Sequence, residues 1–191
     1  MNSWFPIWIG ILDLPPLEDK KRQLQVINVH LRPPVEPNGG ANLWTTSKTN
    51  PFRLKELQNL AATLDTFVEA GKGDTTGTTT LPTIITGDFN EGDTTPLALT
   101  TLTTCTTDDF APGITWMKKT HGFGDGLNEH VPQSRETHRW PLLWGWYTSM
   151  KRLDHILYSK DHLKCTSCRV IPGYQEGASD HQPVIANFLL A

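Results

Sequence analysis

The sequence predicts an α+β domain, and three stretches of the chain carry this prediction. Gln23 to Leu31 alternate between the two faces of a strand. Leu54 to Val68 repeat apolar residues at helical spacing. Thr83 to Thr86 form a short β-branched run that suits a buried strand. A chain of 191 residues is long enough for one domain with a sizeable core, and we expect residues 1–191 to form that single domain.

Charge and composition exclude some classes of protein. The net charge of −3 argues against a broad basic surface that grips nucleic acid non-specifically, although a local basic patch stays open. The apolar start, Met1 to Leu14, lacks a basic leader region and a cleavage site, and it is too short to cross a bilayer. We therefore expect no membrane span.

The three cysteines do not form a disulfide framework, because their number is odd. A reducing compartment is the simpler interpretation, so we expect a cytoplasmic location. Cys165 and Cys168 have the spacing of half a zinc site, but the sequence offers no second pair of ligands. Zinc on these cysteines is the weaker alternative.

The first two strands are predicted to form an antiparallel hairpin. Phe5 to Leu12 form an apolar run that indicates a core strand, and Pro15-Pro16 with the charged run Glu18 to Arg22 indicate a polar turn. In the second strand, one face is apolar, and Asn28 and His30 emerge on the other face.

A helix follows a long loop that spans Pro33 to Thr49. Asn50 has the character of an N-cap, and Pro51 suits the first helical position. The apolar stripe ends at Gly71, a typical helix stop. This helix is predicted to serve packing alone.

The middle of the chain has weaker signals. Gly71 to Thr80 is a Gly/Thr-rich linker, and Thr95-Pro96 predicts a short helix that ends near Cys105. From Asp108 to Trp146 the periodicity is lost, and histidines, arginines and tryptophans accumulate. Such a loop is either a wall of a substrate site or a surface excursion packed on the body of the domain.

Three more strands are predicted in the last part of the chain. They span Lys151 to Ser159, Lys164 to Ile171, and Val184 to Leu190, and a polar loop over Gly177 to Pro183 precedes the last one. Asp154 lies within an otherwise core-like strand. A buried carboxylate is costly unless something pairs with it, so Asp154 requires a partner.

Several polar residues lie on or just after strands that otherwise belong to the core, which indicates one shared polar site. Carboxylates and a carboxamide are hard oxygen donors that suit Mg²⁺ or Mn²⁺ rather than zinc. Histidines beside such a cation suit the cleavage of a phosphate ester. The residues are Asn28, His30, Asp88, Asn90, Asp154, Asp180 and His181.

Four motifs resemble, in their order along the chain, those of the endonuclease/exonuclease/phosphatase family. They are Asn28 to Leu31, Gly87 to Asn90, Arg152 to Leu157, and Ser179 to His181. The resemblance implies a four-layer α/β/β/α sandwich of two mostly antiparallel sheets flanked by helices. It also implies hydrolysis of a phosphodiester or phosphomonoester, in a nucleic acid, an inositol phosphate or a phospholipid headgroup.

The resemblance implies a role for each matching residue. Asp88 would orient or deprotonate the attacking water, and Asn90 would hold that water and a phosphate oxygen. His181 would act as proton donor or charge stabiliser, kept protonated by Asp154. His30 would contact the phosphate from the opposite side.

The remaining predictions concern the metal and the substrate. The metal ligands implied by the resemblance are Asp180, Asp88 and Asn90. The substrate-binding residues that we expect are Asn28, Arg139, Trp140 and Arg152, since aromatic rings stack on bases and cations bind phosphate. The sequence predicts no oligomeric state.

The sequence departs from the family pattern at its start. The family domain normally begins with a strand, a helix and a second strand that ends in Gln-Glu, whose glutamate is the principal metal ligand. Nothing before Gln23 matches, although Asp13 could approach the site. We therefore expect a domain that lacks its N-terminal portion and has an exposed sheet edge. The alternative function is a catalytically impaired remnant of the same fold that lacks the metal-binding glutamate.

Overall fold

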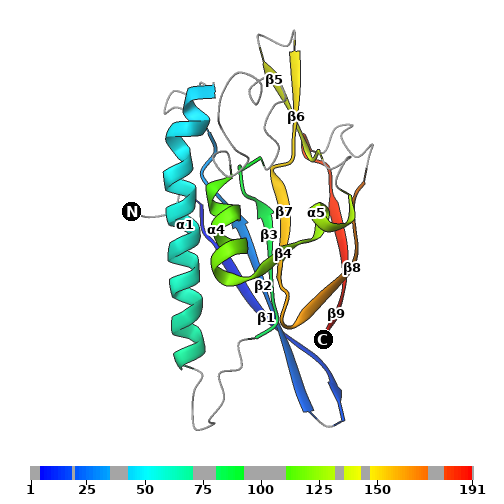
Figure 1. The fold of residues 1–191 in the computed structure, drawn as a ribbon. Helices are drawn as coiled ribbons and strands as arrows, with labels where there is room; N and C mark the ends of the chain where they lie inside the picture. Colours follow the sequence, from blue (N-terminus) through cyan, green and yellow to red (C-terminus); the bar gives the residue numbers. More distant parts are fainter. Residues whose placement is uncertain are drawn as a thin grey trace.

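The structure is a computed structural model that describes residues 5–18, 20–34, 43–70, 81–92, 111–131, 136–142, 147–171 and 179–190. Strands and helices alternate along the chain (Figure 1). They are β1 (Trp8–Leu17), β2 (Lys20–His30), α1 (Leu43–Ala70), β3 (Thr83–Asp88), α4 (Pro112–His121), β4 (Phe123–Asp125), α5 (Gly126–His130), β5 (His138–Leu142), β6 (Tyr147–Lys151), β7 (Asp154–Ser159), β8 (Leu163–Val170) and β9 (Val184–Leu190).

A five-stranded sheet in the order β1-β2-β3-β7-β4 forms the centre of the molecule. β2 and β3 are parallel, and the other neighbours in this sheet are antiparallel. Two antiparallel pairs, β5-β6 and β8-β9, complete the described strands. The α+β class is therefore confirmed, with a mostly antiparallel central sheet and further antiparallel strand pairs.

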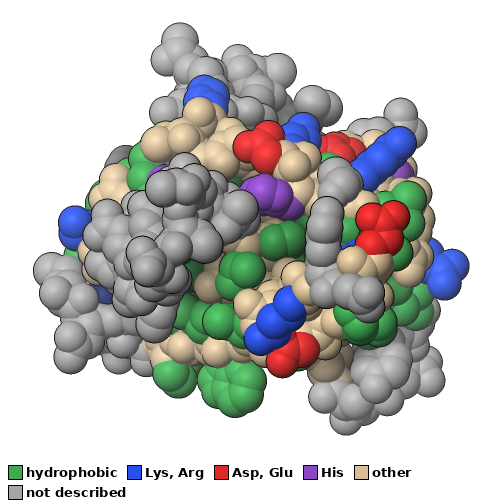
Figure 2. All heavy atoms as spheres, turned by 90° about the horizontal axis from the view of Figure 1, so that it is seen from below, with side chains coloured by type: hydrophobic (Ala, Val, Ile, Leu, Met, Phe, Trp, Pro, Cys, Tyr) green, Lys and Arg blue, Asp and Glu red, His purple; other side chains and the backbone are tan. Residues whose placement is uncertain are grey.

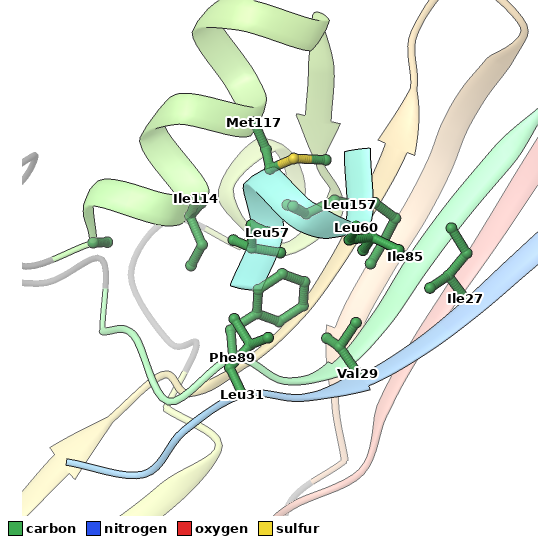
Figure 3. Packing of buried hydrophobic residues seen from close by; sticks show 11 residues of the cluster. Ile27, Val29, Leu31, Leu57, Leu60, Ile85, Phe89, Ile114, Met117 and Leu157 are labelled. Atoms are coloured by element: carbon green, nitrogen blue, oxygen red, sulfur yellow. The ribbon is translucent and has the colours of Figure 1, made fainter. Parts of the chain in front are cut away.

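Helices α1 and α4 cover one face of the central sheet (Figure 1). The core on this face is built from β2, β3, β7 and the two helices, and its side chains interlock around Phe89 (Figure 3). Ile27, Leu57 and Leu157 are completely buried there. The alternation that predicted an apolar face for the second strand is confirmed, because Ile27 and Val29 point into this core while Asn28 and His30 are exposed.

The β8-β9 pair covers the opposite face of the sheet. Ile156 and Tyr158 of β7 pack there against Leu163, Cys165 and other apolar residues of β8 and β9. Helices, central sheet and β8-β9 pair thus form three successive layers of the predicted sandwich in the described part of the chain. α5 is a single short helix that packs beside β8.

Gly87 allows β2 and β3 to approach each other where both strands end. Its φ is +134°, and a Cβ on this residue would clash with the carbonyl oxygen of Val29. Only glycine fits this backbone without strain. This glycine therefore permits the close approach of the two strands.

β1 is an edge strand, so the prediction of a core strand over Phe5 to Leu12 is wrong. Trp8 is 73% exposed and Ile11 is 55% exposed. Hydrophobic side chains also lie among charged ones on the face drawn in Figure 2. β1 does pair with β2 as predicted, but it continues through Pro15 and Pro16 to Leu17. An edge strand tolerates proline, because one side of its backbone needs no partner within the sheet.

α1 begins at Leu43, so the prediction that Asn50 caps this helix is wrong. Pro51 lies inside the helix, where proline ordinarily costs about 3 kcal/mol. Thr49 and Asn50 instead use their side-chain oxygens to accept hydrogen bonds from Arg53, which is fully buried. This local network stabilises the turn that contains the proline.

The region from Asp108 to Trp146 is not one long loop, because α4, β4, α5 and β5 lie within it. α4 lacks a local side-chain cap. The carboxylate of Glu91 caps it instead, accepting hydrogen bonds from the backbone N–H groups of Gly113 and Ile114. A cap supplied from a distant segment leaves no pattern in the local sequence.

The predicted strand over Lys151 to Ser159 divides into the end of β6 and the whole of β7, while β8 and β9 lie where the sequence predicted strands. The short helix predicted after Thr95 and the linker from Gly71 to Thr80 lie outside the described residues. Among the described helices, none is both long and apolar enough to span a bilayer.

Candidate active site

Three neighbouring strands place polar side chains in one row. The parallel register of β2 and β3 pairs His30 with Asp88 at the ends of both strands. The antiparallel register of β3 and β7 pairs Asp88 with Asp154 at the start of β7. Residues far apart in the sequence therefore lie side by side at one edge of the sheet, at the end of the molecule where β5 and β6 lie (Figure 1).

His181 enters this row from the segment before β9. Its backbone forms an isolated antiparallel bridge with His138 of β5. Its Nδ1 lies 2.7 Å from Oδ2 of Asp154, which is a short hydrogen bond to a carboxylate. Its Nε2 lies 3.9 Å from Oδ2 of Asp88. The imidazole is thus held by one aspartate and faces a second one.

Asp88 is fixed by the backbone that follows it. Its Oδ1 accepts a hydrogen bond from the backbone N–H of Asn90 at 2.8 Å, and its Oδ2 lies 3.6 Å from Nε2 of His30. Asn90 has a φ of +51° and is 6% exposed, and its Nδ2 donates to the carbonyl oxygen of Leu31 at 2.9 Å. Asn is among the residues that tolerate this left-handed conformation. The turn that holds the carboxylate is therefore fixed by hydrogen bonds on both sides.

Thr137 is a positioning residue that sequence reasoning missed. Its Oγ1 accepts hydrogen bonds from the backbone N–H groups of Leu153 and Asp154, both at 3.1 Å. Its carbonyl oxygen accepts one from the N–H of Gln182 at 2.7 Å. This buried threonine ties the start of β7 to the segment that carries His181. No local signal marks it, because its partners lie in two distant segments.

The electrostatics of the row favour an acid and a base close together. Burial raises the pKa of Asp88, and the nearby Asp154 carboxylate raises it further. The hydrogen bond to Asp154 raises the pKa of His181 above its usual range, against the opposing effect of burial. The imidazole therefore stays protonated to higher pH, while Asp88 holds a proton more readily than an ordinary aspartate.

The row opens into a cleft of about 280 Å³. Asp154 and His181 line it together with Thr86, Gly87, Ser179 and Gln182. The side chains of Asp88, Asp154 and His181 are 18%, 21% and 26% exposed. They are accessible enough to meet a small anionic group and buried enough for their charges to interact strongly.

Asp180, a predicted metal ligand, groups with two histidines and not with the other predicted ligands. Its side chain is 79% exposed, and its Oδ2 lies 3.3 Å from Nε2 of His138. The pKa of its carboxyl falls below the usual range despite the opposing effect of burial, because a backbone N–H and His138 hydrogen-bond to it. Among the described residues, the group that could hold a cation consists of His138, Asp180 and His181, and Asp88 is not part of it. Two imidazoles and one carboxylate do not fit an all-oxygen Mg²⁺ site.

Arg152 is not a substrate-binding residue, which corrects the prediction. Its side chain is 1% exposed, and its Nη2 lies 2.8 Å from Oδ2 of Asp125. The same carboxylate oxygen lies 3.2 Å from Nδ1 of His155, whose Nε2 is 2.9 Å from the carbonyl oxygen of Glu91. Arg152 therefore belongs to a buried network beneath the site. Sequence reasoning also missed Asp125, whose partners lie 27 and 30 residues away.

The other predicted residues differ in where the structure places them. Asn28 is exposed on β2, beside Thr86 of β3, two residue pairs away from His30 in the register. Arg139 and Trp140 lie on β5, and their side chains are outside the described part of the structure. Asp13 contacts Lys21 and Gln23 within the first hairpin and does not reach the site.

Comparisons with known proteins give the fold a name. An endonuclease/exonuclease/phosphatase from Beutenbergia cavernae is 16% identical, with a TM-score of 0.56, and the match covers 96% of this chain and 39% of that one. Truncated Caenorhabditis elegans TDP2 is 13% identical, with a TM-score of 0.51 and coverages of 98% and 62%. The human Nocturnin catalytic domain with bound sulfate is 15% identical, with a TM-score of 0.50 and coverages of 91% and 49%.

The chain has the fold of the endonuclease/exonuclease/phosphatase proteins, as the motifs predicted. It spans about half the length of the solved structures that it matches. No family model matches the sequence, and no curated protein matches it.

Proposed function

We propose that this chain hydrolyses a phosphate ester, either a phosphodiester or a phosphomonoester. One observation carries the proposal: His181 is bonded through Nδ1 to Asp154 and faces Asp88 through Nε2, in an open cleft. A phosphoesterase needs an acid and a base near the reacting phosphorus, and this row supplies one of each side by side.

The chemistry follows from the two raised pKa values. Asp88 in its ionised form accepts a proton from a water molecule, and a raised pKa makes it a stronger base than an ordinary aspartate. The resulting hydroxide forms a new bond to phosphorus. Asn90, which is fixed against Leu31 and Asp88, positions this water.

His181 takes part as the acid. In its protonated form it neutralises charge on the phosphoryl oxygens and donates its Nε2 proton to the oxygen that leaves as the ester bond breaks. Asp154 keeps the ring oriented and charged. His30 adds a second imidazole on the other side of Asp88, stacked on Phe5 with ring centroids 4.0 Å apart.

Dependence on Mg²⁺ or Mn²⁺ stays a prediction. The described carboxylates do not gather into an oxygen-only site, so no step above passes through a metal. Mg²⁺ often uses one or two carboxylates together with substrate phosphate oxygens. Asp88, which lies beside the cleft with its Oδ2 3.9 Å from Nε2 of His181, is a carboxylate that could contribute in this way.

The substrate class is a phosphate ester in a nucleic acid, an inositol phosphate or a phospholipid headgroup. Support for anion binding comes from the human Nocturnin catalytic domain, a protein of the same fold whose structure contains sulfate, an ion with the shape of phosphate. Fold alone does not determine which ester is cleaved.

Hydrolysis of bis(4-nitrophenyl) phosphate, with and without Mg²⁺ or Mn²⁺, tests the proposal. Turnover that disappears in both Asp88→Ala and His181→Ala would support it. The alternative is a binding remnant of this fold, which is favoured by the missing oxygen-only cation site among the described residues. Binding of inorganic phosphate without turnover under any of these conditions would establish the remnant and reject the enzyme.

A further inference from the structure

His138, Asp180 and His181 form a cluster that the proposed reaction does not fully use. One ring nitrogen from each histidine and one carboxylate oxygen of Asp180 lie within 4.8 Å of one another. Oδ2 of Asp180 is already 3.3 Å from Nε2 of His138. The two imidazole rings lie 4.4 Å apart between centroids.

The backbone holds these residues in place. His138 and His181 are partners in an antiparallel bridge, so their side chains start from directly opposed positions. The hydrogen bond from the N–H of Gln182 to the carbonyl oxygen of Thr137 fixes the next pair of residues. Asp180 precedes His181 and shares its segment. The cluster is therefore built on paired backbone and not on a loose loop.

His181 already has the arrangement of a metal-binding histidine. A ligating histidine usually directs its other ring nitrogen to a carboxylate, which orients the ring and strengthens it as a ligand. Asp154 plays that part here through its 2.7 Å contact with Nδ1. Nε2 of His181 is thus the nitrogen whose lone pair can face a cation.

The donor set selects the kind of cation. Two imidazole nitrogens and one carboxylate oxygen suit borderline ions such as Zn²⁺, whereas Mg²⁺ prefers oxygen alone. Three protein ligands leave one position of a tetrahedral zinc ion for water.

We propose that His138, Asp180 and His181 form a binding site for Zn²⁺. This site shares Asp180 with the Mg²⁺ or Mn²⁺ ligands predicted from the sequence, adds two histidines to it, and does not involve Cys165 or Cys168. Zn²⁺ at this site occupies His181 and prevents it from donating a proton, so the ion inhibits hydrolysis. The inhibition rests on the proposed function, but the binding does not.

The test measures binding before activity. ZnCl₂ is titrated into the whole chain by calorimetry, and CoCl₂ is added as a spectroscopic substitute. We expect one ion per chain and a visible Co²⁺ spectrum of nitrogen and oxygen ligands. A thiolate-to-Co²⁺ charge-transfer band would show that the ion binds to cysteines instead, and it would overturn the proposal. Absence of binding at millimolar ZnCl₂ would overturn it as well.

Variants locate the site. His138→Asn should weaken Zn²⁺ binding at least about tenfold, because losing a direct ligand costs no less than losing one of its supporting partners. Asp180→Asn should do the same. His121→Asn is the matched control, since His121 is an exposed histidine at the end of α4. Equal affinity in all three variants would reject the site, and circular dichroism verifies that each variant is folded.

Inhibition has its own readout. If the protein shows turnover, Zn²⁺ should reduce it over the concentration range in which binding is measured, and His138→Asn should shift that range upward by the same factor. Turnover that rises with Zn²⁺ would refute inhibition while leaving the binding result intact. If no turnover is found, the proposed enzyme fails, and the calorimetric result alone still decides the zinc site.

Discussion

Nδ1 of His181 lies 2.7 Å from Oδ2 of Asp154, and this contact joins the segment before β9 to the first residue of β7. It satisfies two requirements at once. Asp154 gains the partner that a carboxylate at the edge of a core strand needs, and His181 gains a fixed orientation.

Asp154→Asn should lower the pKa of His181, because an amide replaces the carboxylate that favours the imidazolium. NMR titration of the His181 ring protons measures this directly. In the parent protein the raised pKa contributes stability that is fully present below the unfolded value of about 6.5 and is lost as pH rises through the folded value. The variant should lose that pH dependence. An unchanged pKa of His181 in this variant would contradict the conclusion that Asp154 raises it.

Asp88→Asn should abolish turnover while leaving the fold intact, because the amide cannot accept a proton from water. Loss of general base catalysis typically costs about 10²–10⁴-fold in rate. The raised pKa of Asp88 also predicts that the acid limb of the rate profile lies above the range of an ordinary aspartate. Steady-state kinetics between pH 4 and pH 9 measures both. Asp13→Asn, in the first hairpin, is the control.

Gly87→Ala should destabilise the protein by roughly 2 kcal/mol or more, because the residue has a positive φ and the new Cβ meets the carbonyl oxygen of Val29. Gly122→Ala is a matched control. Gly122 also has a positive φ, of +68°, but nothing lies within 4 Å of its added Cβ. It should cost only about 1 kcal/mol. Urea unfolding compares the two, and equal losses would show that the clash is relieved by a small backbone shift.

Arg152→Met should act on stability and not on substrate affinity. It leaves the buried carboxylate of Asp125 without its nearest cationic partner, a change that typically costs about 3–5 kcal/mol. Urea unfolding measures the loss, and KM should stay unchanged in whatever fraction remains folded. A raised KM with normal stability would restore the substrate-binding role.

Asp125→Asn tests the same network through the dependence of stability on acidic pH. Although burial alone raises it, the hydrogen bond from His155 and the charge of Arg152 hold the pKa of Asp125 well below its usual range. A lowered folded pKa gives stability that is present above the unfolded value of about 3.9 and is lost as pH falls through the folded value. The variant should therefore lose less stability than the parent when the pH is lowered from 5 to 2. Unfolding curves at both pH values supply the comparison.

The sequence predicted the parts of this molecule that depend on local pattern. The alternation around Ile27 predicted which face of the strand is buried. The polar residues Asp88 and Asn90 marked the end of a strand. Asp154 was identified because a carboxylate in an apolar strand is anomalous, and the structure brings it to His181. The catalytic roles of these residues stay predictions.

What depends on distant partners was missed. Glu91 caps a helix that starts 21 residues later, and Thr137 is hydrogen-bonded both to the start of β7 and to the segment that carries His181. Arg152 has the residue type of a phosphate ligand, and only the position of Asp125 shows that it is buried. The exposure of Trp8 was also not predicted, because an apolar run does not show whether its strand is central or at the edge of a sheet.

The parallel pairing of β2 with β3 has a consequence for folding. Since α1 must cross over before His30 can meet Asp88, and since Asp154 and His181 come from still later parts of the chain, no short fragment can preassemble the row. The contact order of this cluster is high, so its formation belongs to the slow, cooperative stage of folding. The raised pKa of His181 should consequently be lost only when the whole domain unfolds, and not when a single element frays.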